Sequence, residues 1–468
     1  MIVNVIIFKD DATGGPNQMA LILAAVFAGV VGVFKLKTPY KNIEKGIANS
    51  INMAMTSCLI LLIIGSLIGV WILSGIVPTL IYYGFKIISP GLFLPVACIS
   101  CGIVSLATGS SWTTTGTIGI ALIAIGRTYG IPEGMVAGAI ISGAYFGDKM
   151  SPLSDTTNLA PAMAGTDLFT HIRHMVYTSG PAFLLAVIGF FILGNFYGAG
   201  TMNLEKINEV STLITQNFNI SGYLMIVPFA VLLMVAKKVP AIPALIMGTL
   251  LGVVFALIFQ QELLKSMIGT LSVQGIYQQV IDVLVNGVKI KTGSVPIDKL
   301  FSRGGMSSML STIWLILCAM VFGGALEATG MLQRMAQSIL SLVRGTGSLI
   351  GATLASCIFT NATASDQYVA IVVPGRMFKK AYEDYGLHPK NLSRAVEDAG
   401  TVTSVLIPWN SGGAYNSGVL GVATLTYLPF CFFNLLSPLV SAFLGSMNLT
   451  IERINEDKTS KEEKLVTA

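Results

Sequence analysis

Residues 147–161 read GDKMSPLSDTTNLAP, and this polar stretch stands between two strongly apolar runs. The run before it is GMVAGAIISGAYF, and GPAFLLAVIGFFILG follows it after a short amphipathic piece. The stretch combines two aspartates and a lysine with two prolines and several hydroxyl and amide side chains. Its meaning depends on the solvent in which the chain folds.

Composition identifies that solvent as lipid. Of 468 residues, 53% are hydrophobic and 11% are charged, whereas a soluble domain carries about 25% charged residues. Apolar runs near the ~20 residues that cross a bilayer recur along the chain. They are continuous rather than alternating, which favours helices over a barrel. We therefore expect an all-α polytopic membrane protein. The net charge of +5 lies mostly in loops and tails, which indicates cytoplasmic loops rather than nucleic-acid binding.

Sliding the sequence against itself predicts an internal repeat. At a shift of 255 residues, SLATGSSWTTTG (105–116) falls on TNATASDQYVAI (360–371), so that Ser110 meets Ser365. At a shift of 256 residues, Gly165 meets Gly421. Each half thus carries two polar interruptions. Such paired breaks are typical of the binding site of a secondary transporter, because free backbone groups at membrane depth are tolerated where they line a cavity or lie inside the protein.

Five carboxylates near these breaks are candidates for binding an ion. We expect Asp155 and Asp366 to carry it, with Asp148 and Asp398 next, and Glu397 beside Asp398. A charge at bilayer depth costs at least ~2.5–3.5 kcal/mol, so it usually faces a cavity and a partner. The neighbouring side chains with hydroxyl or amide oxygens, which suit hard cations, are Thr156, Asn158, Ser110, Ser111, Asn361, Thr363, Ser365, Asn410 and Ser411.

Each carboxylate also has a plain structural explanation. Asp148 is adjacent to Lys149, so the two would form an ion pair at a helix end. Asp155 would cap the helical piece that starts at Thr156. The pair at 397–398 would lie at the cytoplasmic interface near Arg394.

The segments GSSWTTTGTIGIALI, GAIISGAYFGDKMSPLSDTTNLAPAMAGTDLFTHIRHM and TNATASDQYVAIVVPGRMF resemble the NhaC-type Na+/H+ antiporter family. That family also holds a Na+-malate/H+-lactate antiporter subgroup, and it belongs to the ion transporter superfamily. The resemblance covers nearly the whole chain. It implies two inverted repeats, each with a re-entrant hairpin and a broken transmembrane helix. The family usually has a complete hydrophobic helix before DDATGGPNQ, whereas only MIVNVIIF precedes that motif here, so the first helix looks shortened.

The repeat and the resemblance together predict how the chain is divided. The expected parts are 1–50, an N-terminal helix with the shortened first helix and a cytoplasmic connector; 51–198, the first repeat; 199–307, a linker with two transmembrane helices and a long loop; 308–447, the second repeat; and 448–468, a charged C-terminal tail.

The expected function is exchange of Na+, and of Li+, for H+ across a bacterial cytoplasmic membrane. One carboxylate could hold either ion, because Asp titrates near ~3.9 in water and burial raises that value by up to ~3–5 units. The alternative is Na+-malate/H+-lactate exchange, since helix N-termini in the breaks suit a dicarboxylate. We expect no enzyme activity, no cofactor and no nucleic-acid partner. Na+ at Asp155 and Asp366 is the only metal predicted, and a homodimer stays open.

Overall fold

The computed structural model describes residues 4, 7, 15–87, 89–198, 204–237, 239–270, 272–290, 298 and 301–454. These residues are helical apart from turns and one isolated β-bridge, Leu387 to Arg453. The predicted shortened first helix, residues 1–8, lies outside the described residues except for Asn4 and Ile7. The predicted tail is described as far as residue 454.

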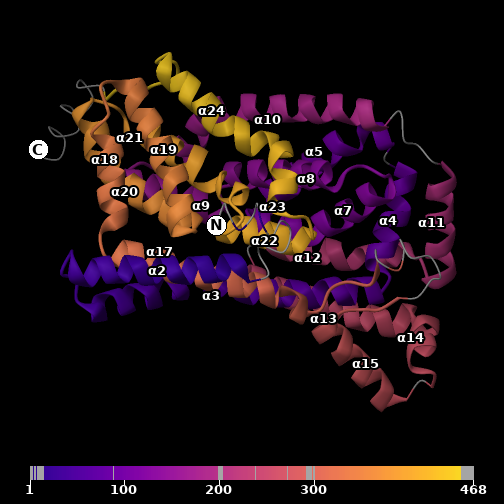
Figure 1. The fold of residues 1–468 in the computed structure, drawn as a ribbon. Coiled ribbons are helices and arrows are strands. Elements are labelled where there is room, and N and C mark those ends of the chain that lie inside the picture. Colours follow the sequence, from indigo (N-terminus) through magenta and orange to yellow (C-terminus); the bar gives the residue numbers. More distant parts are fainter. Residues whose placement is uncertain are drawn as a thin grey trace, which may run out of the picture.

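Four long helices form a layer along one side of the molecule (Figure 1). They are α2 (Pro16–Phe34), α3 (Tyr40–Leu73), α13 (Ala241–Phe259) and α17 (Leu310–Ala328). Small residues bring α3 and α17 together: a Cβ on Gly46 would meet the Cβ of Ala328 at 2.5 Å. Close backbone approach of this kind is how helices pack in lipid, where burial of apolar surface drives little. Helix α3 runs without a break through residue 50, where the sequence predicted a domain boundary.

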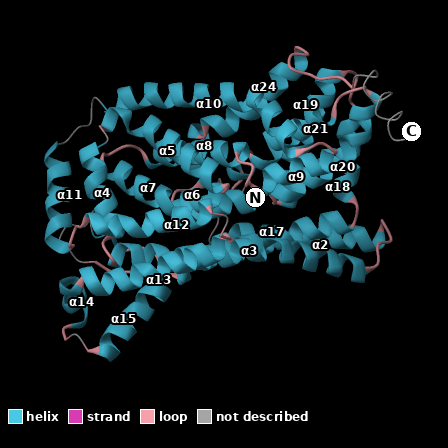
Figure 2. Cartoon of the chain, turned by 180° about the vertical axis from the view of Figure 1, so that it is seen from behind, coloured by secondary structure: helices cyan, strands magenta, loops and turns pink. Residues whose placement is uncertain are grey.

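The predicted first repeat, residues 51–198, begins within α3 and continues after it. Its helices are α4 (Ile76–Ile87), η2 (Pro90–Leu92), α5 (Phe93–Thr108), α6 (Ser111–Thr114), the π-helix η3 (Thr115–Gly119), α7 (Ile120–Thr128), α8 (Glu133–Met150), α9 (Asp155–Ala164) and α10 (Leu168–Gly198). Figures 1 and 2 show α10 along the edge opposite the long-helix layer.

The predicted second repeat, residues 308–447, begins with η5 (Met306–Met309) and α17 and continues after them. Its helices are α18 (Met331–Leu340), α19 (Thr346–Ala364), α20 (Gln367–Asp384), α21 (Pro389–Val396), the π-helix η6 (Glu397–Thr401), η7 (Ser404–Leu406), α22 (Ser411–Leu420), α23 (Thr424–Tyr427), η8 (Leu428–Phe430) and α24 (Phe432–Ser446).

Helix boundaries recur at an offset of 256 residues from the first break onward. In this register α5 ends at the position where α19 ends, and α8 begins at the position where α21 begins. Helix α9 covers the same positions as α22. The connecting residues correspond as well: Gly109 and Ser365 both have a positive φ, and so do Gly165 and Gly421. This recurrence supports the repeat, and it corrects one detail of the sequence alignment.

That detail is the register of the first break. The 255-residue shift placed Ser110 on Ser365, whereas the structure places Gly109 at the position of Ser365 and Ser110 at that of Asp366. Further upstream the 255-residue shift holds, since Gly75 and Gly330 share a positive φ. One extra residue in the second repeat therefore lies between that turn and the break.

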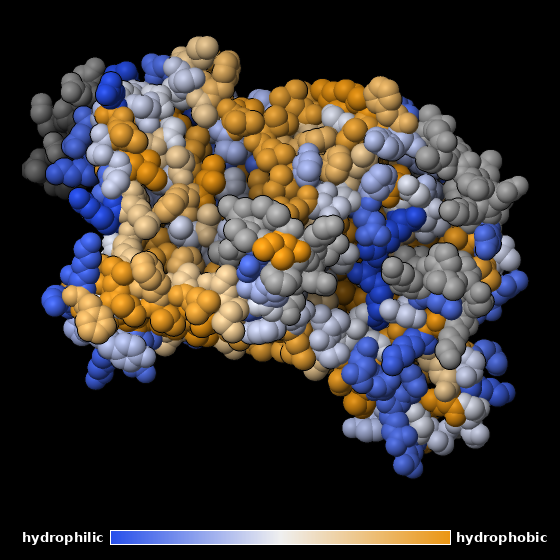
Figure 3. All heavy atoms as spheres, in the orientation of Figure 1, coloured by the Kyte–Doolittle hydropathy of each residue, from blue (hydrophilic) through white to orange (hydrophobic). Residues whose placement is uncertain are grey.

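The segment between the repeats contains more helix than the sequence predicted. It comprises α11 (Leu204–Asn217), η4 (Gly222–Met225), α12 (Ile226–Ala236), α13, α14 (Gln261–Ile268) and α15 (Val273–Asn286). Helices α14 and α15 lie in the expected long loop and project from the body (Figure 1). Both helices have polar faces and therefore contain no continuous apolar run. Hydrophilic residues gather over this projection (Figure 3).

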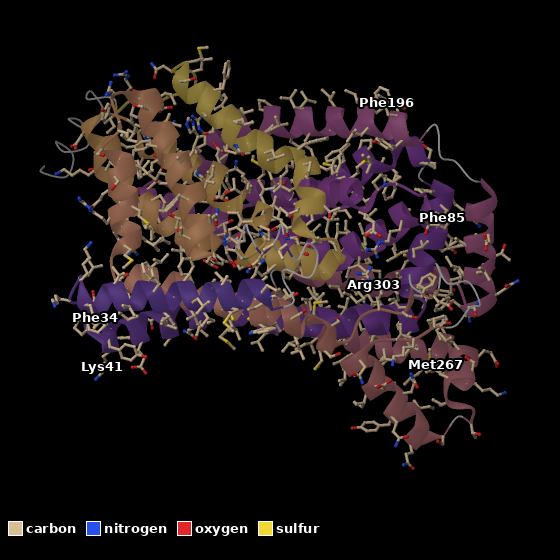
Figure 4. All side chains as sticks on the ribbon, viewed as in Figure 1. Phe34, Lys41, Phe85, Phe196, Met267 and Arg303 are labelled. Carbon is tan, nitrogen blue, oxygen red and sulfur yellow. The ribbon has the colours of Figure 1, made fainter. Side chains whose placement is uncertain are left out.

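Six of the described helices are long and apolar enough to cross a membrane, or up to eight if each of two bent helix pairs is one span. Hydrophobic side chains cover the flank of the long-helix layer (Figure 3). Phe34 and Lys41 lie at one end of this layer, and Met267 marks the projection at the other end (Figure 4). The chain is therefore a multi-pass membrane protein.

Candidate functional site

A cavity of about 830 Å³ lies where the two breaks of the first repeat meet. Its polar side chains come from both breaks and from α3, and its apolar side chains come from the breaks, from α3, α12 and α13, and from the turn between α12 and α13. The second repeat contributes Gln367 and Tyr368 from the start of α20. The polar side chains that line it within the breaks are Thr108, Ser110, Thr113, Asp148, Ser154, Asp155 and Thr156.

The sequence produces both breaks through helix caps. Ser110 Oγ accepts the backbone N–H of Thr113 at 3.1 Å, and Ser154 Oγ accepts that of Thr157 at 3.4 Å. Serine is a favoured N-cap because its oxygen satisfies a donor that has no partner within the helix. Helices α6 and α9 therefore begin at the cavity, and their positive dipole ends lie at its wall.

The two breaks also touch each other. Gly109 adopts the left-handed conformation, and a Cβ built on it would meet the Cβ of Leu153 at 2.6 Å. In the second repeat the equivalent backbone contact is a hydrogen bond, since Ser411 N–H donates to the Ser365 carbonyl at 2.9 Å. Each pair of breaks thus packs as one unit.

Asp148 is the buried carboxylate of the cavity. It lies in the last turn of α8 with 8% of its surface exposed, and its Oδ2 accepts the hydroxyl of Ser111 at 2.6 Å. At the C-terminal end of α8, the hydroxyl of Thr157 donates to the backbone carbonyl oxygen of Lys149 at 3.0 Å. A charged group and its hydroxyl partner are thus held at the wall by two helices.

Asp155, one of the two residues that we ranked first from the sequence, is exposed. It is the first residue of α9 and lines the cavity. Asn158 is exposed one turn later and donates to the carbonyl oxygens of Pro152 and Ser154. Of the two aspartates that line the cavity, Asp155 is therefore exposed and Asp148 is buried.

Asp366 is buried in the second repeat. It caps α20 by accepting the backbone N–H groups of Tyr368 and Val369 at 2.8 and 3.2 Å. Its other oxygen accepts the hydroxyl of Ser411 at 3.2 Å. Three donors thus stabilise the charge of this carboxylate. Because two of them are on α20 and the third is Ser411, Asp366 joins the two breaks of its own repeat.

Two asparagines complete this second group. Asn410 donates to the side-chain oxygen of Asn361 at 3.0 Å, and Asn361 donates to the Gly400 carbonyl at 2.7 Å. Thr363 stays apart, because its hydroxyl bonds back to the Phe359 carbonyl within α19. The predicted oxygens therefore form two groups, one around Asp148 and one around Asp366. Thr363 and Asn158 bond to backbone carbonyls outside both groups, and the Ser365 hydroxyl has no partner among the described residues.

Asp398 and Glu397 form a third group on η6. Lys149 is fully buried and pairs with Asp398 rather than with Asp148. Thr178 and Ser437 also donate to Asp398 Oδ1, at 2.9 and 3.3 Å. The pair thus connects α8, η6, α10 and α24 in the interior, and the ion pair suggested by adjacency in the sequence does not form.

Tyr368 and Gln367 are site residues that sequence reasoning missed. Tyr368 interacts electrostatically with Asp148, Asp155 and Asp366. Gln367 Oε1 accepts the hydroxyl of Ser404 at 3.2 Å, which is the counterpart of the contact between Ser111 and Asp148. A shift of 256 residues aligns Gln367 with Ser111 and Ser404 with Asp148, whereas a shift of 255 residues does not.

The ligand chemistry available is that of hard oxygens. Among the described residues, no three His, Cys, Asp or Glu side chains gather as a metal-binding group. A cation held here would instead use one carboxylate with hydroxyl, amide and carbonyl oxygens, which suits a hard ion.

Known proteins resemble this chain over nearly its full length. The family model described as "Na+/H+ antiporter family" matches residues 143–449. The Na+/H+ antiporter NhaC of Alkalihalophilus pseudofirmus is 37% identical over 93% of this chain and 90% of its own. The malate-2H+/Na+-lactate antiporter of Bacillus subtilis is 37% identical over 90% and 86%, and the NhaC antiporter of that organism is 37% identical over 87% of both chains. The chain therefore belongs to the Na+/H+ antiporter family.

Proposed function

We propose that this protein is a secondary antiporter that exchanges Na+, and Li+, for H+ across a bacterial cytoplasmic membrane. The observation that carries the proposal is the buried Asp148 at the cavity wall, with Ser111 Oγ 2.6 Å from its carboxylate. Relatives named as Na+/H+ antiporters, at 37% identity over most of the chain, support the same reading.

The exchange follows from the physics of a buried carboxylate. When it loses its proton in a poorly hydrated place, the remaining charge must be balanced by a cation or by a new proton. Na+ bound to Asp148 would draw further oxygens from Ser111, Ser110 and the cavity wall. The proton and Na+ compete for one carboxylate, so binding of either ion releases the other.

Asp366 is the second carboxylate of this mechanism. It occupies the position of Ser110 in the 256-residue register, while Asp155 occupies that of Ser411. Each repeat therefore supplies one acid and one hydroxyl across its pair of breaks, with the roles exchanged. We further propose that the repeats are inverted, each with a re-entrant hairpin, and that one bundle moves against the other around these breaks. The exposed Asp155 would attract cations from solution.

Exchange of malate for lactate, coupled to Na+ and H+, is the second candidate; the Bacillus subtilis relative is named for malate with H+ against Na+ with lactate. Its support is the size of the cavity, about 830 Å³, which falls in the range of small-molecule sites and is far larger than a bare cation needs. The N-termini of α6 and α9 at its wall suit a carboxylate ligand. Asp148 and Asp155 oppose an anion unless cations accompany it, which favours the simpler exchange.

Proton movement in everted vesicles from cells that lack their own antiporters tests both candidates. A pH-sensitive dye follows the acidified interior as NaCl, LiCl, KCl, or NaCl with malate and lactate is added. A response to NaCl alone, lost in Asp148→Asn and in Asp366→Asn, would support Na+/H+ exchange. A response that requires malate and lactate would assign the second candidate. Potassium serves as the control cation.

A further inference from the structure

The carboxylate of Glu397 is fully buried and has no hydrogen-bond partner for either oxygen among the described residues. Thr156 and Thr401 stand beside it, yet neither makes a hydrogen bond of ordinary geometry with it. A buried ionised carboxylate without a partner is strongly unfavourable. Something other than this chain's own donors must therefore neutralise Glu397.

Glu397 also forms no salt bridge among the described residues. Lys149 pairs with Asp398 and donates to Ser437 at 3.0 Å. Arg394, one turn before Glu397, donates to the neutral hydroxyl of Thr450 at 3.0 Å. Glu397 is thus the acid of the η6 group that lacks an ion-pair partner.

Other titratable groups around η6 do not change this balance. Those that act on Glu397 or on the Lys149–Asp398 pair are Asp148 from α8, Cys357 from α19, His171 from α10, Tyr382 from α20 and Arg394 from α21. Asp148 is a second acid, and Cys357 and Tyr382 are neutral groups in ordinary water. His171 is buried, with Nδ1 against the hydroxyl of Ser393 at 2.8 Å.

Thr156 connects Glu397 to the cavity. Its side chain lines the cavity, and its hydroxyl lies 3.1 Å from that of Ser154. Thr156 also stands beside Glu397. A hydroxyl in this place can accept a proton on one side and donate one on the other.

Glu397 has no acidic counterpart in the first repeat. In the 256-residue register its position is that of Ile141, and Asp398 corresponds to Ser142. The π-helical turn that carries Glu397 likewise has no equivalent there, since residues 133–150 form the regular helix α8. Single π-turns within helices occur often at functional sites.

We propose that Glu397 is a proton-binding group of the transport cycle, separate from the Na+-binding carboxylate Asp148 and linked to the cavity through Thr156. This inference rests on the proposed exchange and deepens it, because it adds a second proton-binding acid to Asp148, the carboxylate at which Na+ and H+ compete. A proton leaves Glu397 through the hydroxyl of Thr156 when the cavity takes up a cation, and it returns when the cation leaves. Glu397 does not bind Na+ itself.

The test compares two fluxes in proteoliposomes. Exchange of radioactive Na+ for unlabelled Na+ at equal pH needs only the cation site, whereas Na+-driven proton movement needs both. For Glu397→Gln we expect proton movement to fall by about 100-fold, the lower range for a positioned proton-transfer group. Na+/Na+ exchange should stay within about twofold of wild type, as for a substitution away from the cation. Glu397→Asp, which keeps a titratable group, should restore part of the proton movement.

The matched control is Glu383→Gln on the exposed part of α20, which should change neither flux. Proton movement retained by Glu397→Gln would overturn the proposal, and so would equal loss of both fluxes in an inserted protein. If Glu397→Gln does not insert, Glu397→Met replaces it, with the same split expected and equal loss overturning the proposal. If the wild type moves protons only when malate and lactate are present, the proposed Na+/H+ exchange is refuted, but the role of Glu397 is not. The wild type and Glu397→Gln are then compared with both anions present.

Discussion

Ser111 donates its hydroxyl to Asp148 Oδ2 at 2.6 Å, and the residues 256 positions later, Gln367 and Ser404, make the equivalent contact at 3.2 Å. The two repeats are therefore alike at this contact, but only the first repeat has a carboxylate there. In the proposed exchange Asp148 would hold the cation, whereas the second repeat has Ser404 at that position and carries its acid at Asp366, which accepts the hydroxyl of Ser411.

Asp148→Asn tests the charge at this contact. We expect Na+-driven proton movement to fall by at least about 100-fold, because the amide can bind neither ion as a carboxylate does. Ser111→Ala should be milder and raise the half-saturating Na+ concentration by about tenfold, the effect of losing one hydrogen bond to a charged group. Concentration series in vesicles measure both. Full activity of Asp148→Asn would contradict this assignment.

Asp155→Asn tests the exposed carboxylate of the cavity. Because Asp155 is exposed, its charge acts through solvent, and we expect the half-saturating Na+ concentration to rise by only about two- to fivefold, with the maximal rate kept. The difference should shrink when choline chloride raises the ionic strength. A complete loss of transport that salt does not alter would instead make Asp155 a direct ligand.

The two equivalent positive-φ positions predict opposite effects on stability. Gly109→Ala adds a Cβ 2.6 Å from that of Leu153 and a left-handed cost of about 1–2 kcal/mol, so the Tm should fall. Ser365→Gly removes that cost, and the hydroxyl lost has no partner among the described residues, so the Tm should rise slightly. Thermal unfolding in detergent without Na+ measures both. A fall in both variants would show that the Ser365 hydroxyl stabilises the fold.

The buried pair of Lys149 and Asp398 predicts strong coupling. Lys149→Met or Asp398→Leu alone should lower the free energy of unfolding by about 3–5 kcal/mol, because each leaves an uncompensated buried charge. The double variant should regain at least about half of that loss, as hydrophobic replacements of whole ion pairs do. Denaturant unfolding of the wild type, the two single variants and the double variant measures the four free energies of a double-mutant cycle. If the losses of the two single variants add up in the double variant, the two side chains act independently.

His388 predicts a pH dependence outside the membrane-spanning helices. Burial, followed by nearby Lys390, lowers the pKa of His388 below its ordinary value, and its Nδ1 accepts the backbone N–H of Lys390 at 3.2 Å. The unfolded chain therefore binds this proton more readily, so stability is full above about pH 6.5 and declines as the pH falls below it.

The segment affected is the end of the described chain, because His388 N–H donates to the Glu452 carbonyl at 2.9 Å. Limited proteolysis of residues 448–454 should therefore speed up on acidification from about pH 8 to 5. His388→Asn keeps a capping oxygen without the titration, so its proteolysis should vary less with pH. Equal pH profiles would exclude His388 as the cause.

The sequence alone determined the class of protein, the breaks and most of the candidate side chains. With 11% charged residues, the chain has too few charges to cover a water-facing surface, and polar breaks in apolar helices demand a cavity or a buried partner. Ser110 and Ser154 act as caps in keeping with their residue type. These features depend on composition and local geometry, which a sequence contains.

Tertiary structure decided which acids lie inside and which partners they have. Asp148 and Asp155 are seven positions apart in one polar stretch, yet one is buried and the other exposed. Lys149 is adjacent to Asp148 and pairs with Asp398 instead. The physical reason is that burial and charge pairing depend on the packing of helices distant in sequence. The chain order fixes only which side chains are available, and the packing of α8 against η6 and α24 fixes which of them meet.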